Sequence, residues 1–535
     1  MKVSDPRFAD FGVLPPDSKG DFAFLLHGLF HLGINGTMAI VLPHGVLFRG
    51  AAEGEIRKRL LDKGLLDTII GLPSNLFTNT GIPVVVMVLK KNRNIGDPVL
   101  VIDASHSFIK VGKQNVLEEK DIAKIVDTYS NRMEIPGYSH LATREEIIDN
   151  DYNMNIPRYV ESIDSEIPHD VDAHILGGIP QKNIEELSVL NLSVPDILDN
   201  SLNPIRPGYV ELINSIDDLT EEVLRDSRII NKTNEVAAKS EEYISKYWDS
   251  LRNVTRPTDI LQLREEMLDE IKQLLSEFKF IDVYDGYQII ADIWKEALTH
   301  DSELIAASNF YAVARTREPN MVTKGTGKNK REEQDGWIGS IIPNELIAER
   351  LYTEEVNEIK NKQSRVQEVD IELSELVEAA KVEDTDENNA LYEVIKKNEE
   401  DEPQDSFENK MVKVELKKAT KGTIEHELLK KVEKLMVEKS TLSKAIKSEE
   451  KDLKDMVYDR ILSLTDEEID DLVYEKWFGN VVTDLVNLVT IPLKAELRTL
   501  DMLNKRYANT LSELDTEIRT LEEAFETLMS EMVVE

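Results

Sequence analysis

Three short apolar segments near the N-terminus limit what this chain can fold into more than any other feature. They are Thr37–Leu42, Leu66–Leu72 and Val84–Leu89, and glycine or proline bounds each of them. Segments of this length that are apolar on both faces are typical of strands buried in a sheet that helices cover. Val99–Asp103 is a candidate for one more strand.

Helical spacing of apolar residues separates these segments. A helix is predicted within Asp21–Leu32, before the first segment, and a charged helix with Ile56 and Leu60 lies between the first and the second. Because the two periodicities alternate along the chain, residues 1–160 are predicted to form an α/β domain.

The final third of the chain has the clearest apolar periodicity. Alternating steps of four and three residues meet Leu493, Leu497, Leu500, Asn504, Tyr507, Leu511, Leu514, Ile518, Leu521, Phe525 and Leu528. A single Asn in such a stripe commonly sets the register of a coiled coil. Further stripes run from Leu428 to Ile446 and from Val356 to Leu373. Long coiled-coil helices that pack on one another or on a partner are therefore predicted for residues 346–535.

The region between these two parts is less regular. Residues 161–345 have a helical and irregular pattern, and residues 380–410 are an acidic low-complexity stretch that predicts a solvated linker. The sequence thus predicts an α/β region followed by a mostly α region, with boundaries near residues 160 and 345.

The net charge of −38 is unevenly distributed. Residues 1–100 hold 11 Lys and Arg against 9 Asp and Glu, whereas the remainder holds 53 against 93. Because acidic surface repels phosphate, residues 101–535 are a poor general DNA clamp. If DNA is bound, the near-neutral first hundred residues or a partner must supply most of the positive charge.

The absence of cysteine excludes disulfides, thiolate zinc sites and cysteine nucleophiles. It is typical of a reducing cytoplasm. No apolar run approaches the roughly 18 residues that span a bilayer, and the N-terminus lacks a signal pattern. A soluble cytoplasmic protein is expected.

Several long motifs in series are more specific than any short pattern. They read DPRFADFGVLPPDSKGDFAFLLHGLFHL, GTMAIVLPHGVLFRGAAEGEIRKRLL, IIGLPSNLFTNTGIPVVVMVLKK and NDYNMNIPRYV. These motifs closely resemble the modification subunit of type I restriction–modification systems. Residues 1–160 match that family tightly, and the later part, with YQIIADIWKEALTHDSEL, matches more in arrangement than in detail.

The resemblance implies methyl transfer from S-adenosylmethionine to N6 of adenine in double-stranded DNA. In the family, a Gly-rich turn of a Rossmann-like sheet binds the cofactor, and an Asn-Pro-Pro-Phe-type tetrapeptide holds the adenine. Neither motif occurs here. The resemblance therefore makes residues 1–160 the C-terminal half of a methyltransferase domain, with Thr37–Leu42, Leu66–Leu72 and Val84–Leu89 as strands 5 to 7. As a truncated or split enzyme, the chain alone is expected to bind no cofactor, hold no catalytic residue and be inactive.

Phe77 is the main candidate site residue. It lies in the loop after the second apolar segment, where open α/β sheets bind ligands, and an enzyme that acts on a base inside a duplex must extrude that base. The resemblance gives an aromatic at this place the role of stacking on the base, and a loop Phe that plugs the core is an equal alternative. Asn75, Thr78 and Thr80 are candidates for contacts to base or phosphate, although such residues commonly only shape a turn.

His44 and Arg49 are weaker candidates for contacts to the base or the DNA backbone. A turn with a satisfied histidine and a surface arginine is the favoured alternative. His27 and His31 have the spacing of a helical metal pair, but no third ligand pattern follows and methyl transfer needs no metal. No metal site is predicted.

The resemblance also implies partners. In the family, two modification subunits flank one specificity subunit that reads the DNA sequence. DNA, a specificity subunit and a restriction subunit are therefore expected partners, together with a second copy of the chain or an upstream chain, and no membrane. The stripe that ends at Leu528 suits the helices of a specificity subunit, and internal packing explains it equally well. A non-catalytic scaffold that binds a specificity subunit is the alternative function, and methylation of RNA or protein is a third.

Overall fold

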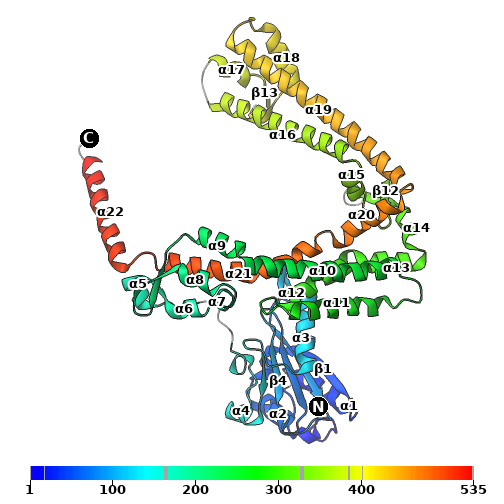
Figure 1. The fold of residues 1–535 in the computed structure, drawn as a ribbon, viewed down its shortest axis with the longest axis vertical. Coiled ribbons are helices and arrows are strands. Elements are labelled where there is room, and N and C mark those ends of the chain that lie inside the picture. Colours follow the sequence, from blue (N-terminus) through cyan, green and yellow to red (C-terminus); the bar gives the residue numbers. More distant parts are fainter. Residues whose placement is uncertain are drawn as a thin grey trace. The chain divides into compact units, whose positions relative to one another are not determined.

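The computed structural model describes residues 2–16, 18–161, 167–325, 330–382, 386–399 and 402–532. Contacts divide the chain into two compact units, whose elements are labelled in Figure 1. The first unit comprises Met1–Ser245, Leu261–Glu296 and Asn480–Glu535. The second comprises Lys246–Ile260 and Ala297–Gly479.

The first unit begins with a mixed five-stranded sheet in the order β1-β3-β2-β4-β7. Its strands are β1 (Thr37–Pro43), β2 (Leu66–Gly71), β3 (Val84–Lys90), β4 (Val99–Asp103) and β7 (Ser139–Ala142). β3 runs antiparallel to both β1 and β2, whereas β2 and β4 are parallel. The strands predicted from the apolar segments are thus confirmed, and so is the additional strand at Val99–Asp103.

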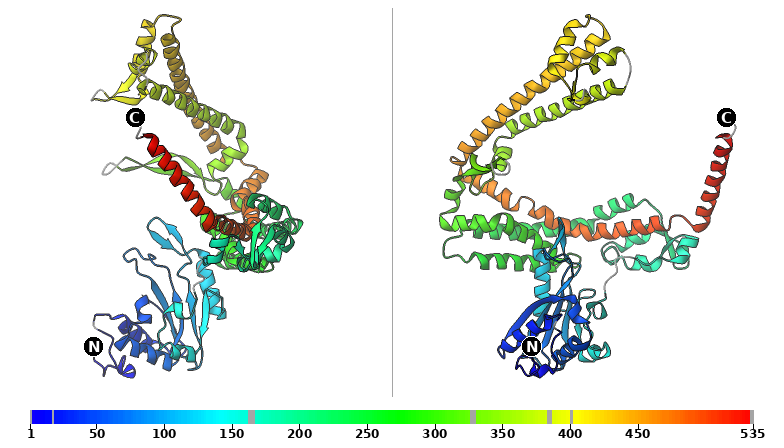
Figure 2. Two further views of the ribbon diagram at one scale, coloured as in Figure 1. Left: turned by 90° about the vertical axis from the view of Figure 1, so that its left-hand side faces the viewer. Right: turned by 180° about the vertical axis from the view of Figure 1, so that it is seen from behind.

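Helices cover both faces of this sheet (Figure 2). On β3, Val85, Met87 and Leu89 pack in a core with α1 (Asp21–His31) and α2 (Ala51–Asp62). Val84 and Val88 belong to a second core, which includes residues of α3 (Glu119–Asn131). Because successive side chains of a strand point to opposite faces, a strand that is apolar throughout needs a cover on each side.

β1 is an edge strand of this sheet. It pairs with β3 along its whole length, and no strand within the described ranges pairs with its other edge. Apart from the buried Leu42, its apolar side chains are only partly covered, and Val41 is 50% exposed. An exposed apolar edge presents unpaired N–H and C=O groups on which another strand can add.

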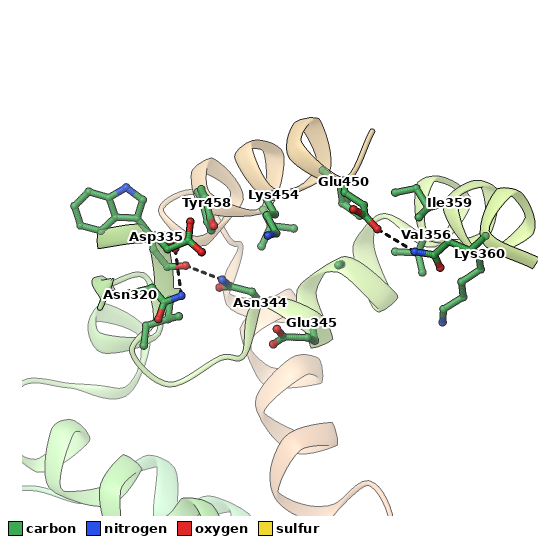
Figure 3. Close-up of a pocket in the computed structure, with 16 residues that line it drawn as sticks. Asn320, Asp335, Asn344, Glu345, Val356, Ile359, Lys360, Glu450, Lys454 and Tyr458 are labelled. Atoms are coloured by element: carbon green, nitrogen blue, oxygen red, sulfur yellow. Dashed lines mark hydrogen bonds between the residues drawn. The ribbon is translucent and has the colours of Figure 1, made fainter. Parts of the chain in front are cut away.

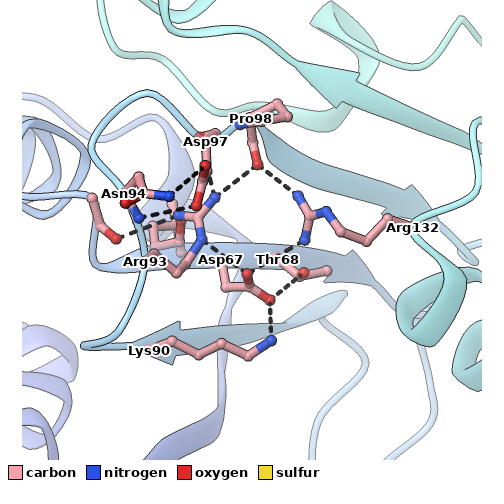
Figure 4. Close-up of polar contacts among 10 residues, drawn as sticks. Asp67, Thr68, Lys90, Arg93, Asn94, Asp97, Pro98 and Arg132 are labelled. Carbon is pink, nitrogen blue, oxygen red and sulfur yellow. Dashed lines mark hydrogen bonds and ion pairs between the residues drawn. The ribbon is translucent and has the colours of Figure 1, made fainter. Parts of the chain in front are cut away.

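A buried ion network lies at the opposite end of β2 from its following loop (Figure 4). The side chain of Asp67, near the start of β2, is only 3% exposed. Its carboxylate lies 2.9 Å from Arg93, 3.2 Å from Lys90 and 3.4 Å from Arg132, and accepts a hydrogen bond from Thr68. This network joins β2, β3, the loop after β3 and the end of α3.

The remaining elements of the first unit are mostly helices. They are β5 (Ile109–Val111), β6 (Gln114–Val116), α4 (Arg144–Asp149), α5 (Val171–Leu176), β8 (Ile179–Pro180), α6 (Gln181–Glu185), α7 (Ser188–Ser193), α8 (Pro195–Asn200), β9 (Leu202–Arg206), β10 (Tyr209–Leu212), α9 (Ile216–Arg225), α12 (Val283–Ile293), α21 (Val481–Arg506) and α22 (Leu511–Met532). Three further helices include residues of both units, namely α10 (Ser227–Arg252), α11 (Ile260–Ser276) and η4 (Trp294–Leu298).

The apolar stripe from Leu493 to Leu528 is divided between two helices with different surroundings. The α21 part is buried in a core with residues of α7, α8 and α9. The chain leaves the helix after Arg506 and starts α22 at Leu511. In α22 the stripe is exposed, at Leu511, Leu514, Ile518, Leu521, Phe525 and Leu528. The continuous stripe therefore serves internal packing in its first half only.

The second unit contains a β-hairpin and two long helices. Its elements are α13 (Thr299–Ala307), α14 (Phe310–Ala314), β11 (Arg317–Lys324), β12 (Arg331–Gly339), α15 (Asn344–Leu351), α16 (Thr353–Val382), α17 (Asp386–Tyr392), β13 (Ile395–Lys397), β14 (Pro403–Phe407), α18 (Asn409–Lys418), α19 (Ile424–Ile461) and α20 (Asp466–Phe478). α16 and α19 pack antiparallel, because Lys362 bonds Glu449 at 2.5 Å whereas Arg365 bonds Glu438 at 2.7 Å.

The acidic stretch 380–410 is more ordered than its composition predicts. Residues 383–385 and 400–401 lie outside the described residues. The remainder forms α17, β13 and β14, and Leu391, Val394, Ile395 and Phe407 are buried against α16 and α19 residues. The linker prediction missed these few apolar residues because the many carboxylates around them dominate the composition.

The helices in the described ranges include none that is both long and apolar enough to cross a bilayer.

Candidate functional site

The predicted site residues lie near one edge of the sheet. β1 and β2 are parallel to each other, since both run antiparallel to β3, and β4 is parallel to β2. The carboxyl ends of these three strands therefore meet at one edge, the position where open α/β sheets bind ligands. His44 follows β1, the loop 72–83 follows β2, and Asp103 ends β4.

The loop 72–83 is held in a defined conformation by its own backbone. The N–H of Leu72 donates to the carbonyl of Val84 at 3.0 Å, and that of Asn75 donates to Gly81 at 3.4 Å. Asn75 has a positive φ of 53°, which Asn tolerates better than most residues. A Cβ on Gly81 would lie 2.8 Å from Oδ1 of Asn75, so a side chain there would push Asn75 out of place.

A second anchor comes from the β5–β6 hairpin. Asn115, on β6, is 6% exposed. Its side-chain amide donates to the carbonyl of Ser74 at 2.8 Å, and its backbone N–H donates to that of Asn75 at 3.0 Å. Asn115 is not among the residues predicted from the sequence. Its one local signal is that Asn is uncommon within strands.

Phe77 lies at the tip of this anchored loop and is 45% exposed. An isolated antiparallel bridge joins Phe77 to Thr80 across the tip. The alternative in which Phe77 plugs the core does not describe this conformation, because a residue that plugs a core is almost fully covered and Phe77 is exposed. Its exposed aromatic face is available for stacking on a planar ligand.

The polar candidates around Phe77 are also exposed. Asn75, Thr78 and Thr80 all lie on the same loop. The Thr80 hydroxyl accepts a hydrogen bond from the N–H of Ile82 at 3.4 Å, so it helps to shape the turn. The side chains of Asn75 and Thr78 make no hydrogen bond with the described parts of the chain and are open to a ligand.

His44 is joined to the same loop. Its backbone N–H donates to the carbonyl of Pro83 at 3.3 Å. Its ring meets the ring of Phe48 edge-on, with 5.9 Å between the ring centres. Burial lowers the pKa of His44 below its ordinary value and outweighs the Asp103 carboxylate, which acts in the other direction. A neutral imidazole at pH 7 offers one donor and one acceptor beside the loop.

Arg49 is committed to contacts within the protein. Its guanidinium lies 3.1 Å from Asp21, at the start of α1, and 3.2 Å from Glu53 on α2. These ion pairs tie α1 to α2. Arg49 therefore does not join Phe77 and His44 through any of its hydrogen bonds.

The histidine pair of α1 is not arranged around a metal. His27 and His31 meet edge-on at 4.7 Å, and Nδ1 of His27 lies 3.2 Å from the guanidinium of Arg7. A cation at this distance opposes the binding of a metal ion. Groups of three or more His, Cys, Asp or Glu that suit a metal do not occur within the described ranges.

The second unit contains a separate groove of about 510 Å³ (Figure 3). Residues of β12, α15, α16 and α19 line it, including Trp337, Asn344, Lys360 and Tyr458. The side-chain amide of Asn344 donates to the carbonyl of Trp337 at 2.7 Å. The groove contains none of the predicted site residues.

Comparison with known proteins identifies relatives of the N-terminal region. Residues 1–167 match the family described as N-6 DNA Methylase. The chain is 38% identical over 214 residues to the type I restriction enzyme MpnII methylase subunit of Mycoplasma pneumoniae, across 40% of this chain and 36% of that protein. It is 36% identical over 205 residues to the MjaVII methylase subunit of Methanocaldococcus jannaschii, across 37% and 33%.

A solved structure is also similar in sequence. The methyltransferase subunit of a type I restriction-modification system from Streptococcus thermophilus is 57% identical over 30% of this chain and 34% of its own, with a TM-score of 0.30. The matched region spans about a third of the length of the curated relatives.

Proposed function

We propose that this chain takes part in DNA methylation within a type I restriction–modification system, on the premise that its N-terminal region is related to the N-6 DNA methylases. In this proposal S-adenosylmethionine is the methyl donor and N6 of adenine in double-stranded DNA is the acceptor. The match of residues 1–167 carries the proposal. An anchored loop with an exposed aromatic side chain, at the carboxyl edge of the sheet, supports it.

Phe77 is proposed to stack on the extruded adenine. A base that leaves the duplex loses its stacking partners, and an aromatic ring replaces them on one face. Asn75, Thr78 and neutral His44 are proposed to bond the base or the adjacent phosphates. The anchors from Asn115 would keep this loop in place while the base enters.

The donor-binding part of the reaction is proposed to come from another polypeptide segment. We place β1, β3 and β2 as strands 5, 7 and 6 of a Rossmann-like sheet. The free edge of β1 would then pair with the strand that precedes the Asn-Pro-Pro-Phe tetrapeptide in the family. The unpaired edge and the exposed Val41 support this placement. The chain alone is proposed to be inactive.

A methyl-transfer assay tests this proposal. The purified chain is mixed with tritiated S-adenosylmethionine and duplex DNA, with and without a polypeptide that carries the donor-binding half. Incorporation into adenine only in the mixture is the expected result. Incorporation by the chain alone would refute the need for a second segment, and none in either case would count against the function itself.

Substitution of Phe77 tests the role of the loop in the reconstituted mixture. Stacking on an aromatic ring contributes about 1–3 kcal/mol per base, so Phe77→Ala should lower methylation efficiency about 5- to 150-fold. Phe77→Tyr should retain most of it. Ile82→Ala, an equally exposed change in the same loop, is the matched control.

A second candidate function is that of a non-catalytic scaffold. The observation that favours it is the exposed stripe of α22, where Leu521 and Phe525 are 62% and 63% exposed. A narrow apolar stripe on a long helix suits the helices of a partner, for which we propose a specificity subunit. Co-purification with a specificity subunit, with no methylation in the reconstituted mixture, would favour the scaffold.

A further inference from the structure

Helix α18 carries a concentration of positive charge in an acidic chain. Residues 409–421 contain five lysines and one glutamate, whereas the whole chain has a net charge of −38. Lys410, Lys413 and Lys417 are spaced by three and four residues and are all exposed. This spacing places them on one side of the helix, and these three residues are called the lysine face below.

The core beneath α18 fixes the direction of the lysine face. Val412 is 1% exposed and packs in a cluster with Leu429 and Val432 of α19, and Leu416 packs against the same cluster. These two residues hold a neighbouring part of the helix surface against α19, and the three lysines beside it remain exposed to solvent.

The charges of the lysine face are not neutralised by the described parts of the chain. Glu415, the one carboxylate within α18, pairs with Lys418 at 2.7 Å. Lys410, Lys413 and Lys417 have no ion pair with any described residue. Other lysines of this unit do pair, since Lys362 lies 2.5 Å from Glu449. A local positive potential therefore remains at this face.

We propose that the lysine face binds the phosphate backbone of duplex DNA. The choice of DNA as the ligand rests on the proposed function. The presence of an exposed positive face does not depend on that function. The seven residues from Lys410 to Lys417 span about 10 Å of helix, and duplex DNA carries about one negative charge per 1.7 Å of its axis. Three ammonium groups over this length can each meet a phosphate.

The acidic surface of the rest of the chain restricts DNA to the lysine face. Repulsion between the acidic surface and DNA is screened beyond about 10 Å at 0.1 M salt, so local charge decides where the duplex touches the protein. The lysine face would hold flanking DNA without reading its sequence, because lysine contacts to phosphate carry no base information.

The test measures binding of the full chain to a labelled 30-base-pair duplex by fluorescence anisotropy, without S-adenosylmethionine, over a range of salt concentrations. The variant carries Lys410→Gln, Lys413→Gln and Lys417→Gln. Each lost phosphate contact lowers the slope of log affinity against log salt by about 0.9. A fourfold rise in salt should therefore weaken the unsubstituted chain roughly 40-fold more than the variant.

Three lysines of α19 provide a matched control. Lys444, Lys447 and Lys451 have the same spacing and are exposed, but residues 444–455 hold four carboxylates against four lysines and so have no net positive charge. Their replacement by Gln should leave the salt slope unchanged. Gln and Lys have similar helix propensities, and an unchanged circular dichroism spectrum confirms the fold. Replacement of the lysine face by arginine should retain binding.

Three results would overturn the proposal. They are no DNA binding by the unsubstituted chain at low salt, equal salt slopes for it and the lysine-face variant, or equal losses in the variant and the control. If the lysine-face variant binds DNA as the unsubstituted chain does but loses self-association, the partner of the lysine face is an acidic protein and the proposal is wrong. A failure of methylation leaves this binding result unaffected, so the two proposals fail separately.

Discussion

Removal of the buried Asp67 carboxylate should open the sheet of the first unit. Asp67→Asn keeps the shape of the side chain and removes the negative charge that Arg93, Lys90 and Arg132 share. The side chain of Arg93 is 6% exposed, and burial already lowers the pKa of its guanidinium, with Asp67 as the largest opposing influence. The substitution would leave that guanidinium buried without a counter-charge.

The structure determines the expected size of this effect. Breaking a buried pair costs about 3–5 kcal/mol. Arg93 keeps hydrogen bonds to the carbonyls of Leu66 and Pro98, and Lys90 and Arg132 can turn toward water. The lower end, about 3 kcal/mol, is therefore expected, which corresponds to a roughly 150-fold larger opening constant.

Hydrogen exchange of the β2 and β3 amides measures this opening directly in the full chain, because protection reports the free energy of local unfolding. Asp10→Asn is the control. Asp10 lies 3.8 Å from Lys63 with its side chain 80% exposed, and exposed pairs contribute about 0–1 kcal/mol. If exchange in Asp67→Asn stays within about threefold of the unsubstituted chain, the charge network is not what holds these strands together.

Three other predictions concern the loop anchor, a histidine and the last helix. Asn115→Leu should leave the Ser74 carbonyl without its donor and loosen residues 72–83 by about 1–3 kcal/mol, seen as faster exchange in that loop alone. Burial lowers the pKa of His140, but its bonds to Glu146 and Glu134 outweigh burial and raise it above 6.5. Its stabilisation is therefore complete below pH 6.5 and is lost as pH rises through the raised pKa. NMR titration gives the pKa, and above pH 6.5 the thermal midpoint of His140→Gln should vary less with pH than that of the unsubstituted chain. Leu521→Glu should leave the thermal midpoint unchanged, because this side chain is 62% exposed, while abolishing co-purification with a specificity subunit.

The positions of the strands were predictable because each is recorded locally. An apolar run between glycine and proline residues defines β1, β2 and β3 within one or two residues. Their order is different, since β3 inserts between β1 and β2 although it follows both in the chain. Spacing and composition carry no information on this order, which the tertiary structure alone decides.

The candidate site was predictable as a loop but not as a conformation. Phe77 was placed after β2 from the sequence, yet burial and exposure were equal alternatives for its ring. The contact that anchors this loop involves Asn115, which is 41 residues from Ser74. No local pattern around either residue reports such a contact. Arg49 was a candidate for a contact to DNA, but the structure pairs it with Asp21, which is 28 residues away in the chain. No local pattern predicts that pairing either.

The last third of the chain shows most clearly what the sequence determines and what only the tertiary structure determines. The period of apolar residues from Leu493 to Leu528 is a local property, and it determined that long helices form there. It did not determine what they pack against, since α21 is buried in the protein and α22 is exposed. Helix formation depends on neighbours along the chain, whereas burial depends on which distant segments fold onto the stripe.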